Sequence, residues 1–415
     1  MKVFKFGGAS VKSATGVRNV ASIIAQYPPQ GLLIVVSAMG KTTNSLENVL
    51  SAVRAGRNAS HLLDELYEYH LSVMKPLFPS AHSVYAAVDQ IISELRAALT
   101  QSYDDYDMVY DQVVAKGELI SSTIVHHHLA DHGLPSTWLD ARACIATDNT
   151  FREGKVDWNK TMAEIAKVKP LLTHGIVITQ GFIGQTEDGL TTTLGREGSD
   201  FTAAIFASCL DAESVTIWKD VPGVMSADPK RLPDATVFSE LPYREAAEMT
   251  YYGASVIHPK TIKPLANKGI PLWVKNFDDP ALPGTIIHDC TVANLPPLIV
   301  FKENQCLVSC KVTDFTFITE EQLGFVFRAL NELGLRINVM QNSAISFSFC
   351  VDFRESKVAA LIQKLQEHFE VFYNTALTLI TIKNYDERSF EKYRKHDGVL
   401  LEQSSRSTLQ VLVRR

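Results

Sequence analysis

The stretch ITQGFIGQTEDGLTTTLGREGSD, residues 178–200, carries the densest set of structural signals in the chain. Residues 178–183 are apolar enough for a buried strand, and the Glu-Asp-Gly sequence at 187–189 is typical of a turn that reverses the chain. Two glycines then flank Arg196, just before a helical pattern that Ser199 is predicted to cap. Because free N–H groups and the helix dipole favour an anion at a helix start, the stretch predicts a phosphate or carboxylate site.

Composition narrows the class of protein. At 415 residues and 46% hydrophobic content, the chain can form two or three folded domains. A net charge of -6 and a pI near 6.1 argue against a general nucleic-acid binder, which needs a basic surface. The six cysteines show neither metal-ligand spacing nor a disulfide framework, the start MKVFKFGG reads as a strand, and no apolar run approaches the ~20 residues of a membrane span. These features predict a cytoplasmic protein that is neither secreted nor membrane-spanning.

The N-terminal segment predicts a strand that ends at a ligand. Residues 3–6 form a short apolar strand, and the Gly-Gly-Ala-Ser sequence at 7–10 is a loop that a ligand can approach closely. A lysine inside such a strand is costly unless it is paired, so Lys5 is expected to face an anion or a carboxylate. The alternative is an edge-strand lysine exposed to water.

Residues 32–38, LLIVVSA, predict a central strand of a parallel sheet. The following MGKTTN is not a P-loop, because that motif requires glycine where Val35 stands. Polar residues after the carboxyl end of a strand are candidates for ligand contact, with helix capping as the alternative. They are Ser37, Thr42, Thr43 and Asn44.

Helical spacing continues from Ser45 to about Leu129, with a break at Pro76–Pro79. Glu118 is the one acid in the apolar run 117–122. It is either exposed or buried, and a buried glutamate requires a cationic partner such as a substrate ammonium group. Three consecutive histidines, 126–128, project around a helix, which is poor metal geometry, so their expected role is structural.

The middle of the chain continues the α/β pattern. The strand at 214–220 ends in Lys219 and Asp220, and charged residues at that end of a strand are expected to be functional. The turn-rich loop 221–231 could lie over a nucleotide. Further predicted elements are strands at 135–140, 271–276 and 284–288, a helix at 158–172 and a helical segment at 241–268 with a break at His258–Pro259.

A proline-containing linker at 294–297 precedes a change of pattern. The next segments predict the β-α-β-β-α-β order of a ferredoxin-like unit, at 306–313, 320–333, 336–342, 345–353, 355–369 and 370–383. The tail predicts a helix at 386–395 and strands at 399–402 and 408–413, which is half of a second unit without its closing helix and strand.

Seven blocks, in this order, resemble the aspartate kinase family: KFGGAS, VVSAMGKTTN, GELISS, TQGFIG, TTTLGREGSD, WKDVPGVMSADP and GASVIHP. The resemblance covers essentially the whole chain. It implies an amino-acid-kinase α/β/α sandwich with a mostly parallel central sheet over residues 1–296. C-terminal ferredoxin-like (ACT) α+β modules would follow, one at 297–383 and a truncated second ACT-like module at 384–415.

The implied activity is transfer of a phosphoryl group from ATP, with Mg²⁺, to the side-chain carboxylate of L-aspartate, the first step toward lysine, threonine and methionine. Lys5 would stabilise charge during transfer, and Asp200 would orient Lys5 or the metal rather than act as a base. Arg196 would bind the α-carboxylate and Glu118 the ammonium group. The other implied substrate contacts are Ser37, Thr43, Glu197, Gly198 and Ser199, and the implied nucleotide contacts are Lys5, Phe6, Gly7, Gly8, Lys219, Asp220, Met225, Lys230, Ser255 and Val256.

The chain departs from the family pattern at several of these positions. Ala9 replaces a common threonine, and Glu197 replaces the middle glycine of GRGGSD. Met225 and Ser255 stand where relatives often have tyrosine and lysine, and Lys219 stands where many have threonine. Lys219 is expected to supply the positive charge that these departures remove.

The ACT region implies an amino-acid effector, threonine or lysine, and edge-to-edge pairing into a homodimer. Lysine-sensitive relatives place acids where this chain has Asn338, Asn342 and Ala344, which argues against lysine feedback. The alternatives are another kinase of the superfamily, acting on acetylglutamate, glutamate, carbamate or a uridine nucleotide, and an amino-acid sensor without turnover. A fused homoserine dehydrogenase is not expected, because no further G-x-G-x-x-G unit follows.

Overall fold

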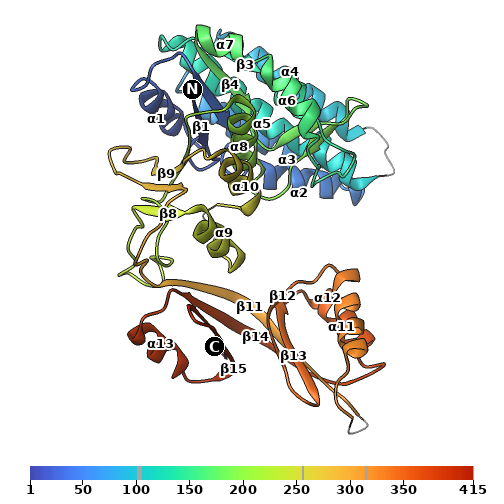
Figure 1. The fold of residues 1–415 in the computed structure, drawn as a ribbon. Coiled ribbons are helices and arrows are strands. Elements are labelled where there is room, and N and C mark those ends of the chain that lie inside the picture. The colour runs from blue at the N-terminus through green and yellow to red at the C-terminus, as the bar shows by residue number, and fades with distance from the viewer. Residues whose placement is uncertain (101–104, 255–256, 314–315, 415) are drawn as a thin grey trace. The chain divides into compact units, whose positions relative to one another are not determined.

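A computed structural model describes residues 1–100, 105–254, 257–313 and 316–414. The chain divides into two compact units, each with its own sheet (Figure 1). The first comprises Met1–Val224, Val237–Ala247 and Ser255–Val292, and the second comprises Met225–Thr236, Glu248–Ala254 and Ala293–Arg415.

The first unit is built on a mostly parallel sheet, as the sequence predicts. Its strand order in the described part of the chain is β3-β4-β2-β1-β7-β9-β10-β8, and only the β9–β10 pair is antiparallel. The strands are β1 (Lys2–Phe6), β2 (Leu32–Val36), β3 (Ser136–Leu139), β4 (Ile176–Gln180), β7 (Ser214–Lys219), β8 (Glu240–Pro242), β9 (Leu272–Asn276) and β10 (Thr285–His288). The central strands β2 and β4 are buried along their whole length, because helices cover both faces of the sheet.

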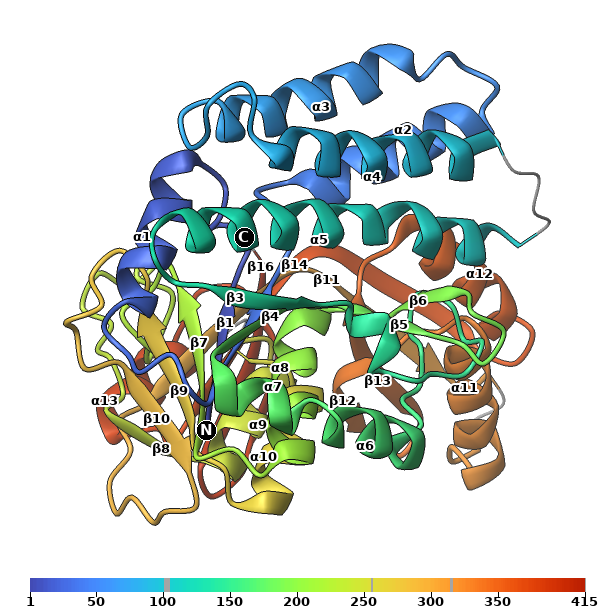
Figure 2. The ribbon, with the colours of Figure 1, turned by 90° about the horizontal axis from the view of Figure 1, so that it is seen from above.

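Figure 2 shows α5 on one face of this sheet and α8 on the other. The helical block predicted for residues 45–129 is confirmed as four helices. The helices are α1 (Ala14–Ile24), α2 (Thr42–Arg54), α3 (Ser60–Met74), α4 (Ser83–Thr100), α5 (Tyr106–Asp131), α6 (Trp158–Ala166), α7 (Lys169–His174), α8 (Gly198–Leu210), α9 (Tyr243–Tyr251) and α10 (Pro259–Lys268). The prediction of one helix at 158–172 is wrong, because a separate helix, α7, begins at Lys169 with Pro170 in its first turn, where a missing N–H is tolerated.

The stretch 178–200 folds into more pieces than its apolar pattern predicts. The predicted strand 178–183 is two strands, β4 and β5 (Ile183–Gln185), separated at Phe182, whose φ of 72° is left-handed. β5 pairs with β6 (Thr191–Thr193) as an antiparallel hairpin, which confirms the predicted turn at 187–189.

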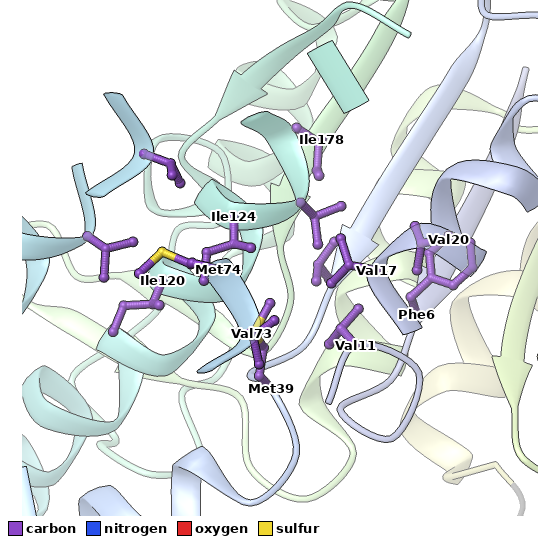
Figure 3. Packing of buried hydrophobic residues seen from close by; sticks show 14 of the residues in the cluster. Phe6, Val11, Val17, Val20, Met39, Val73, Met74, Ile120, Ile124 and Ile178 are labelled. Carbon is purple, nitrogen blue, oxygen red and sulfur yellow. The ribbon is translucent and has the colours of Figure 1, made fainter. Parts of the chain in front are cut away.

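One part of the core of the first unit lies between the sheet and the helices on the α5 side, and Figure 3 shows some of its residues. Ile178 of β4 and Ile120 and Ile124 of α5 are completely buried there. Phe6 stacks on Trp218 of β7 with ring centroids 6.0 Å apart and planes 4° apart. This apolar layer fixes the ends of β1 and β7, and so the residues that follow them.

The second unit contains one antiparallel sheet of order β12-β13-β11-β14-β16-β15 in the described residues. The predicted order of elements is confirmed as β11 (Leu298–Lys311), α11 (Glu320–Glu332), β12 (Ile337–Asn342), β13 (Ser346–Asp352), α12 (Glu355–Leu365) and β14 (Glu370–Lys383). The tail forms α13 (Glu387–Arg394), β15 (Val399–Ser404) and β16 (Thr408–Arg414).

The tail sheet differs from the prediction that its closing strand is missing. A register shift after Lys302 divides β11 into two parts. The first part, residues 298–302, pairs with residues 379–383 of β14, whose other neighbour is β16. An earlier segment of the chain therefore occupies the place of the closing strand. Among the described helices, none has the length and apolarity to cross a membrane.

Candidate active site

A cavity of about 700 Å³ opens in the first unit where β1, β2, β4 and β7 end and α8 begins. The carboxyl ends of parallel strands are the usual ligand position in an open α/β sheet. The structure brings most of the predicted site residues together around it: Lys5, Gly8, Ser37, Thr43, Glu118, Arg196, Glu197, Gly198, Ser199, Asp200 and Lys219.

A buried carboxylate holds two lysines at the floor of this cavity. Asp200, on the first turn of α8, has Oδ1 2.6 Å from Lys5 Nζ and Oδ2 3.5 Å from Lys219 Nζ. Burial acts to raise the pKa of Asp200, but the two lysine charges outweigh it and the net pKa is lowered. Asp200 is therefore an anion that fixes two cations, and the prediction that Lys5 faces a carboxylate is confirmed.

Glycine lets the loop after β1 approach the loop after β2. A Cβ at Gly8 would lie 2.7 Å from the carbonyl oxygen of Ala38, and Gly40 N donates a hydrogen bond to Gly8 O at 3.0 Å. A Cβ at Gly7 would lie 3.4 Å from Lys5 Nζ. The backbone here forms a narrow cradle beside a cation, a shape that suits phosphate oxygens.

Glu118 projects from α5 into the cavity and is buried. Its Oε1 accepts a hydrogen bond from Ala38 N at 3.4 Å, whereas its Oε2 has no partner among the described residues. Burial raises the pKa of Glu118 from 4.5 to about 8. A carboxylate in this position is poorly compensated, and a cationic ligand group in the cavity would supply the missing partner.

The start of α8 differs from the prediction. The helix begins at Gly198, so Ser199 lies inside its first turn and the prediction that Ser199 is the cap is wrong. Glu197 occupies the cap position in a left-handed conformation, φ 54°, and its side chain makes no capping hydrogen bond. Two of the first N–H groups of α8 are already paired, because Gly198 N donates to Gly195 O and Asp200 N donates to Glu197 O, each at 3.0 Å. Arg196 also lines the cavity. It is exposed and forms no ion pair with any residue that the structure describes.

Sequence reasoning missed the part of the wall built around Asp111. Asp111 Oδ2 accepts hydrogen bonds from Arg152 N at 2.9 Å and Thr193 N at 2.8 Å, and Oδ1 accepts one from Thr193 Oγ1 at 2.7 Å. Burial raises the pKa of Asp111 to about 6. Arg152, at a left-handed φ of 65°, stacks over the Tyr110 ring at 4.1 Å. Asp111 thus joins α5, the 148–154 loop and β6. The available signal in the sequence was an acid inside an otherwise apolar stretch of the helix.

Several predicted contacts lie elsewhere. The Phe6 side chain is in the core, so only its backbone can reach a ligand. Thr42 is buried with Oγ1 3.3 Å from His70 Nε2, and Asn44 is exposed, so of these neighbours only Thr43 lines the cavity.

The remaining predicted nucleotide contacts do not line the cavity. Asp220 follows β7 outside the cavity lining, and Met225 and Lys230 belong to the second unit. Ser255 and Val256 lie outside the described residues. The structural role expected for the histidines agrees with His126 Nδ1 lying 2.8 Å from Ser136 Oγ.

The chain is similar to known proteins over nearly its whole length. The model of the amino acid kinase family matches residues 1–276. Lysine-sensitive aspartokinase 3 of Escherichia coli is 31% identical over 361 residues, which cover 84% of this chain and 78% of that protein. Aspartokinase 1 of Arabidopsis thaliana is 32% identical, covering 88% of this chain and 66% of that protein.

Other relatives are longer. A bifunctional aspartokinase/homoserine dehydrogenase of Zea mays is 30% identical, and the match spans 88% of this chain but 41% of that protein. Among solved structures, E. coli aspartokinase III superimposes with a TM-score of 0.85 at 27% identity, covering 100% of this chain and 96% of that one. The aspartate kinase of Clostridium acetobutylicum, at 21% identity and a TM-score of 0.81, shares the fold. The chain belongs to the amino acid kinase family and, within it, to the aspartokinases.

Proposed function

We propose that this chain transfers the γ-phosphoryl group of ATP to the side-chain carboxylate of L-aspartate, which gives 4-phospho-L-aspartate. The observation that carries the proposal is the buried, half-partnered carboxylate of Glu118 in a cavity that two lysines and two arginines also line. E. coli aspartokinase III, which has the same fold, was solved in complex with aspartate and ADP.

Opposite charges would orient the amino acid. Glu118 would accept the α-ammonium group, and pairing would keep Glu118 ionised despite its burial. Arg196 would bind the α-carboxylate through its planar pair of N–H donors. Ser37, Thr43, Glu197, Gly198 and Ser199 would complete the acceptor site, since all five line the same cavity. This orientation leaves the side-chain carboxylate as the group that faces Lys5.

The acceptor needs no general base, because a carboxylate is already ionised near neutral pH. The barrier is the repulsion between an anionic acceptor and a polyanionic nucleotide. Lys5 and Lys219 would offset it with positive charge that Asp200 holds in place before the reaction. Because both Asp200 oxygens are paired with lysines, Asp200 serves as the positioning residue for these cations.

The loop at Gly7 and Gly8 would receive the nucleotide phosphates, with Phe6 contributing backbone alone. Asp220, Met225, Lys230, Ser255 and Val256 remain predicted nucleotide contacts. When bound, Mg²⁺ would arrive with the phosphates and neutralise part of their charge. The residues present fit a Mg²⁺ ion that is held mainly by the nucleotide. Asp200 is already compensated by two lysines, and phosphate oxygens are the hard ligands that Mg²⁺ prefers.

The test is an acceptor panel. The full chain is incubated with MgATP and L-aspartate, L-glutamate or acetylglutamate, and the acyl phosphate is trapped with hydroxylamine. The expected result is hydroxamate from L-aspartate alone, and hydroxamate from another acceptor would indicate a different kinase of the superfamily. The absence of product with every acceptor would favour the sensor function.

The second unit would bind an amino-acid effector, threonine or lysine, and join two chains into a cytoplasmic homodimer. Large apolar side chains are exposed on it, including Phe327, Met340, Phe372 and Tyr373. E. coli aspartokinase III was also solved with lysine and aspartate. Light scattering gives the mass of the assembly, and adding each amino acid to the acceptor assay identifies the effector.

A further inference from the structure

A cluster of three side chains with metal-binding groups lies at the edge of the first unit's sheet, apart from the residues that line the active-site cavity. Edge strand β8 runs parallel to β10, with Glu240 opposite Ile286 and Pro242 opposite His288. Leu241 and Ile287 point into the core, so the alternation of side chains places Glu240 and His288 together on the outer face. Cys290 follows His288 by two residues.

The ligand atoms of Glu240, His288 and Cys290 all lie within 4.8 Å of one another. His288 Nε2 is 2.6 Å from Glu240 Oε1. Zinc bonds of roughly 2.0–2.3 Å place tetrahedral ligand atoms about 3.3–3.8 Å apart. A metal ion therefore fits between the three groups after side-chain adjustments of about 1 Å, without a change in the strand register.

Cys290 differs from the other cysteines of the chain. The other five are buried, whereas Cys290 is half-buried and lies beside an imidazole and a carboxylate. The side chains of His288 and Glu240 are 30% and 45% exposed, so solvent and ions reach the cluster.

We propose that Glu240, His288 and Cys290 bind a divalent transition-metal ion of the zinc type, with water in the fourth position. Thiolate and imidazole ligands favour zinc, cobalt or nickel over magnesium and calcium, which prefer oxygen ligands. Binding forms the metal–sulfur bond as the Cys290 thiol releases one proton to solvent, and the imidazole donates the lone pair of Nε2. The inference does not depend on the proposed phosphoryl transfer.

The consequence is structural. β8 has only three residues, and in the described part of the chain β10 is the one strand it pairs with. A metal ion that joins β8 to the end of β10 would secure this edge strand, in the way that bound metal adds to folding free energy in other small metal sites.

The test uses the full chain, treated with a chelator, kept reduced and titrated with Co²⁺. Thiolate ligation gives a sulfur-to-cobalt charge-transfer band, and Zn²⁺ should displace the cobalt and remove the band. We expect one Co²⁺ per chain, release of one proton and a higher melting temperature with Zn²⁺ but not with Mg²⁺. Absence of the band in the wild-type protein would overturn the proposal.

Variants separate the site from adventitious binding. Cys290→Ser should lose the band, while Glu240→Gln, which keeps the thiol and imidazole, should bind at least about tenfold more weakly. Asp289→Asn is the matched control, because Asp289 is an exposed acid between His288 and Cys290 but not a member of the cluster. It should bind Co²⁺ like the wild type. A band that persists in Cys290→Ser, or equal affinity in Glu240→Gln, would contradict the assignment.

Discussion

Replacing Glu118 with glutamine is predicted to stabilise the ligand-free protein while abolishing its affinity for aspartate. Burial raises the pKa of Glu118 from 4.5 to about 8, so at pH 7 the folded chain keeps a proton that the unfolded chain releases. Because only the unfolded chain loses this proton as pH rises from 4.5 to 7, the free energy of unfolding falls by about 3 kcal/mol over that interval. Glutamine keeps the shape and the acceptor for Ala38 N, but an unpaired amide N–H costs about 1 kcal/mol. The expected net gain is about 2 kcal/mol.

The sign of the pH dependence gives a second criterion. An acid whose pKa is raised in the folded state makes the protein less stable as pH rises from 4.5 to 8. The advantage of Glu118→Gln should therefore be near zero at pH 5 and largest at pH 8. Denaturant unfolding at pH 5, 7 and 8 measures it, with Glu367→Gln, an exposed glutamate, as the control.

Aspartate links the stability change to binding. Aspartate at 100 times its dissociation constant should stabilise the wild type by about 2.7 kcal/mol, and Glu118→Gln should show no such effect. The account is refuted if the variant is less stable than wild type at pH 7, if its advantage is the same at pH 5 and 8, or if aspartate stabilises both proteins equally.

Four further changes test other parts of the structure. Lys5→Ala should lower kcat about 10²–10³-fold with little change in KM for aspartate, and steady-state kinetics showing loss confined to KM would contradict its role. Lys219→Thr should raise KM for ATP, so an unchanged KM would show that this lysine does not serve the nucleotide. Burial lowers the pKa of His70 from 6.5 to about 4, so its contribution is present above pH 6.5 and is lost as pH falls toward 4, by up to about 3 kcal/mol. Urea unfolding of wild type and His70→Gln should show this loss in the wild type alone, and parallel pH profiles would count against it. Glu197→Gly should raise the free energy of unfolding by about 1 kcal/mol, because glycine adopts the left-handed φ of 54° without strain, and urea unfolding that shows a destabilised variant would contradict this.

Much of the fold could be predicted because local patterns determine it. Apolar runs marked β1, β2 and β7. The strand–helix order of the second unit was also predicted, but β11 begins at Leu298, eight residues before the predicted start at 306. Short elements with little apolar pattern were not predicted, and β8, with three residues, is the clearest case. The tail sheet could not be predicted because residues 298–302 complete it from a distant part of the chain.

The site was predicted in its components more than in its geometry. Lys5 was expected to face a carboxylate, but spacing alone could not identify Asp200, 195 positions later, as its partner. The roles of Asp111 and Arg152 depend on a left-handed residue and on one face of a buried helix, which leave no periodic signal. The cluster of Glu240, His288 and Cys290 was missed because the spacing of the cysteines does not show that Glu240, on a different strand from His288, lies beside them.

The most direct test of the proposed function is the position of phosphorylation on aspartate. The full chain is incubated with MgATP, L-aspartate and hydroxylamine, and the hydroxamate is identified by comparison with authentic α- and β-aspartyl hydroxamates. Because Glu118 and Arg196 would hold the α-amino and α-carboxylate groups, we expect β-aspartyl hydroxamate alone. Formation of the α-isomer, or of no hydroxamate while aspartate still binds, would contradict the proposed orientation and phosphoryl transfer.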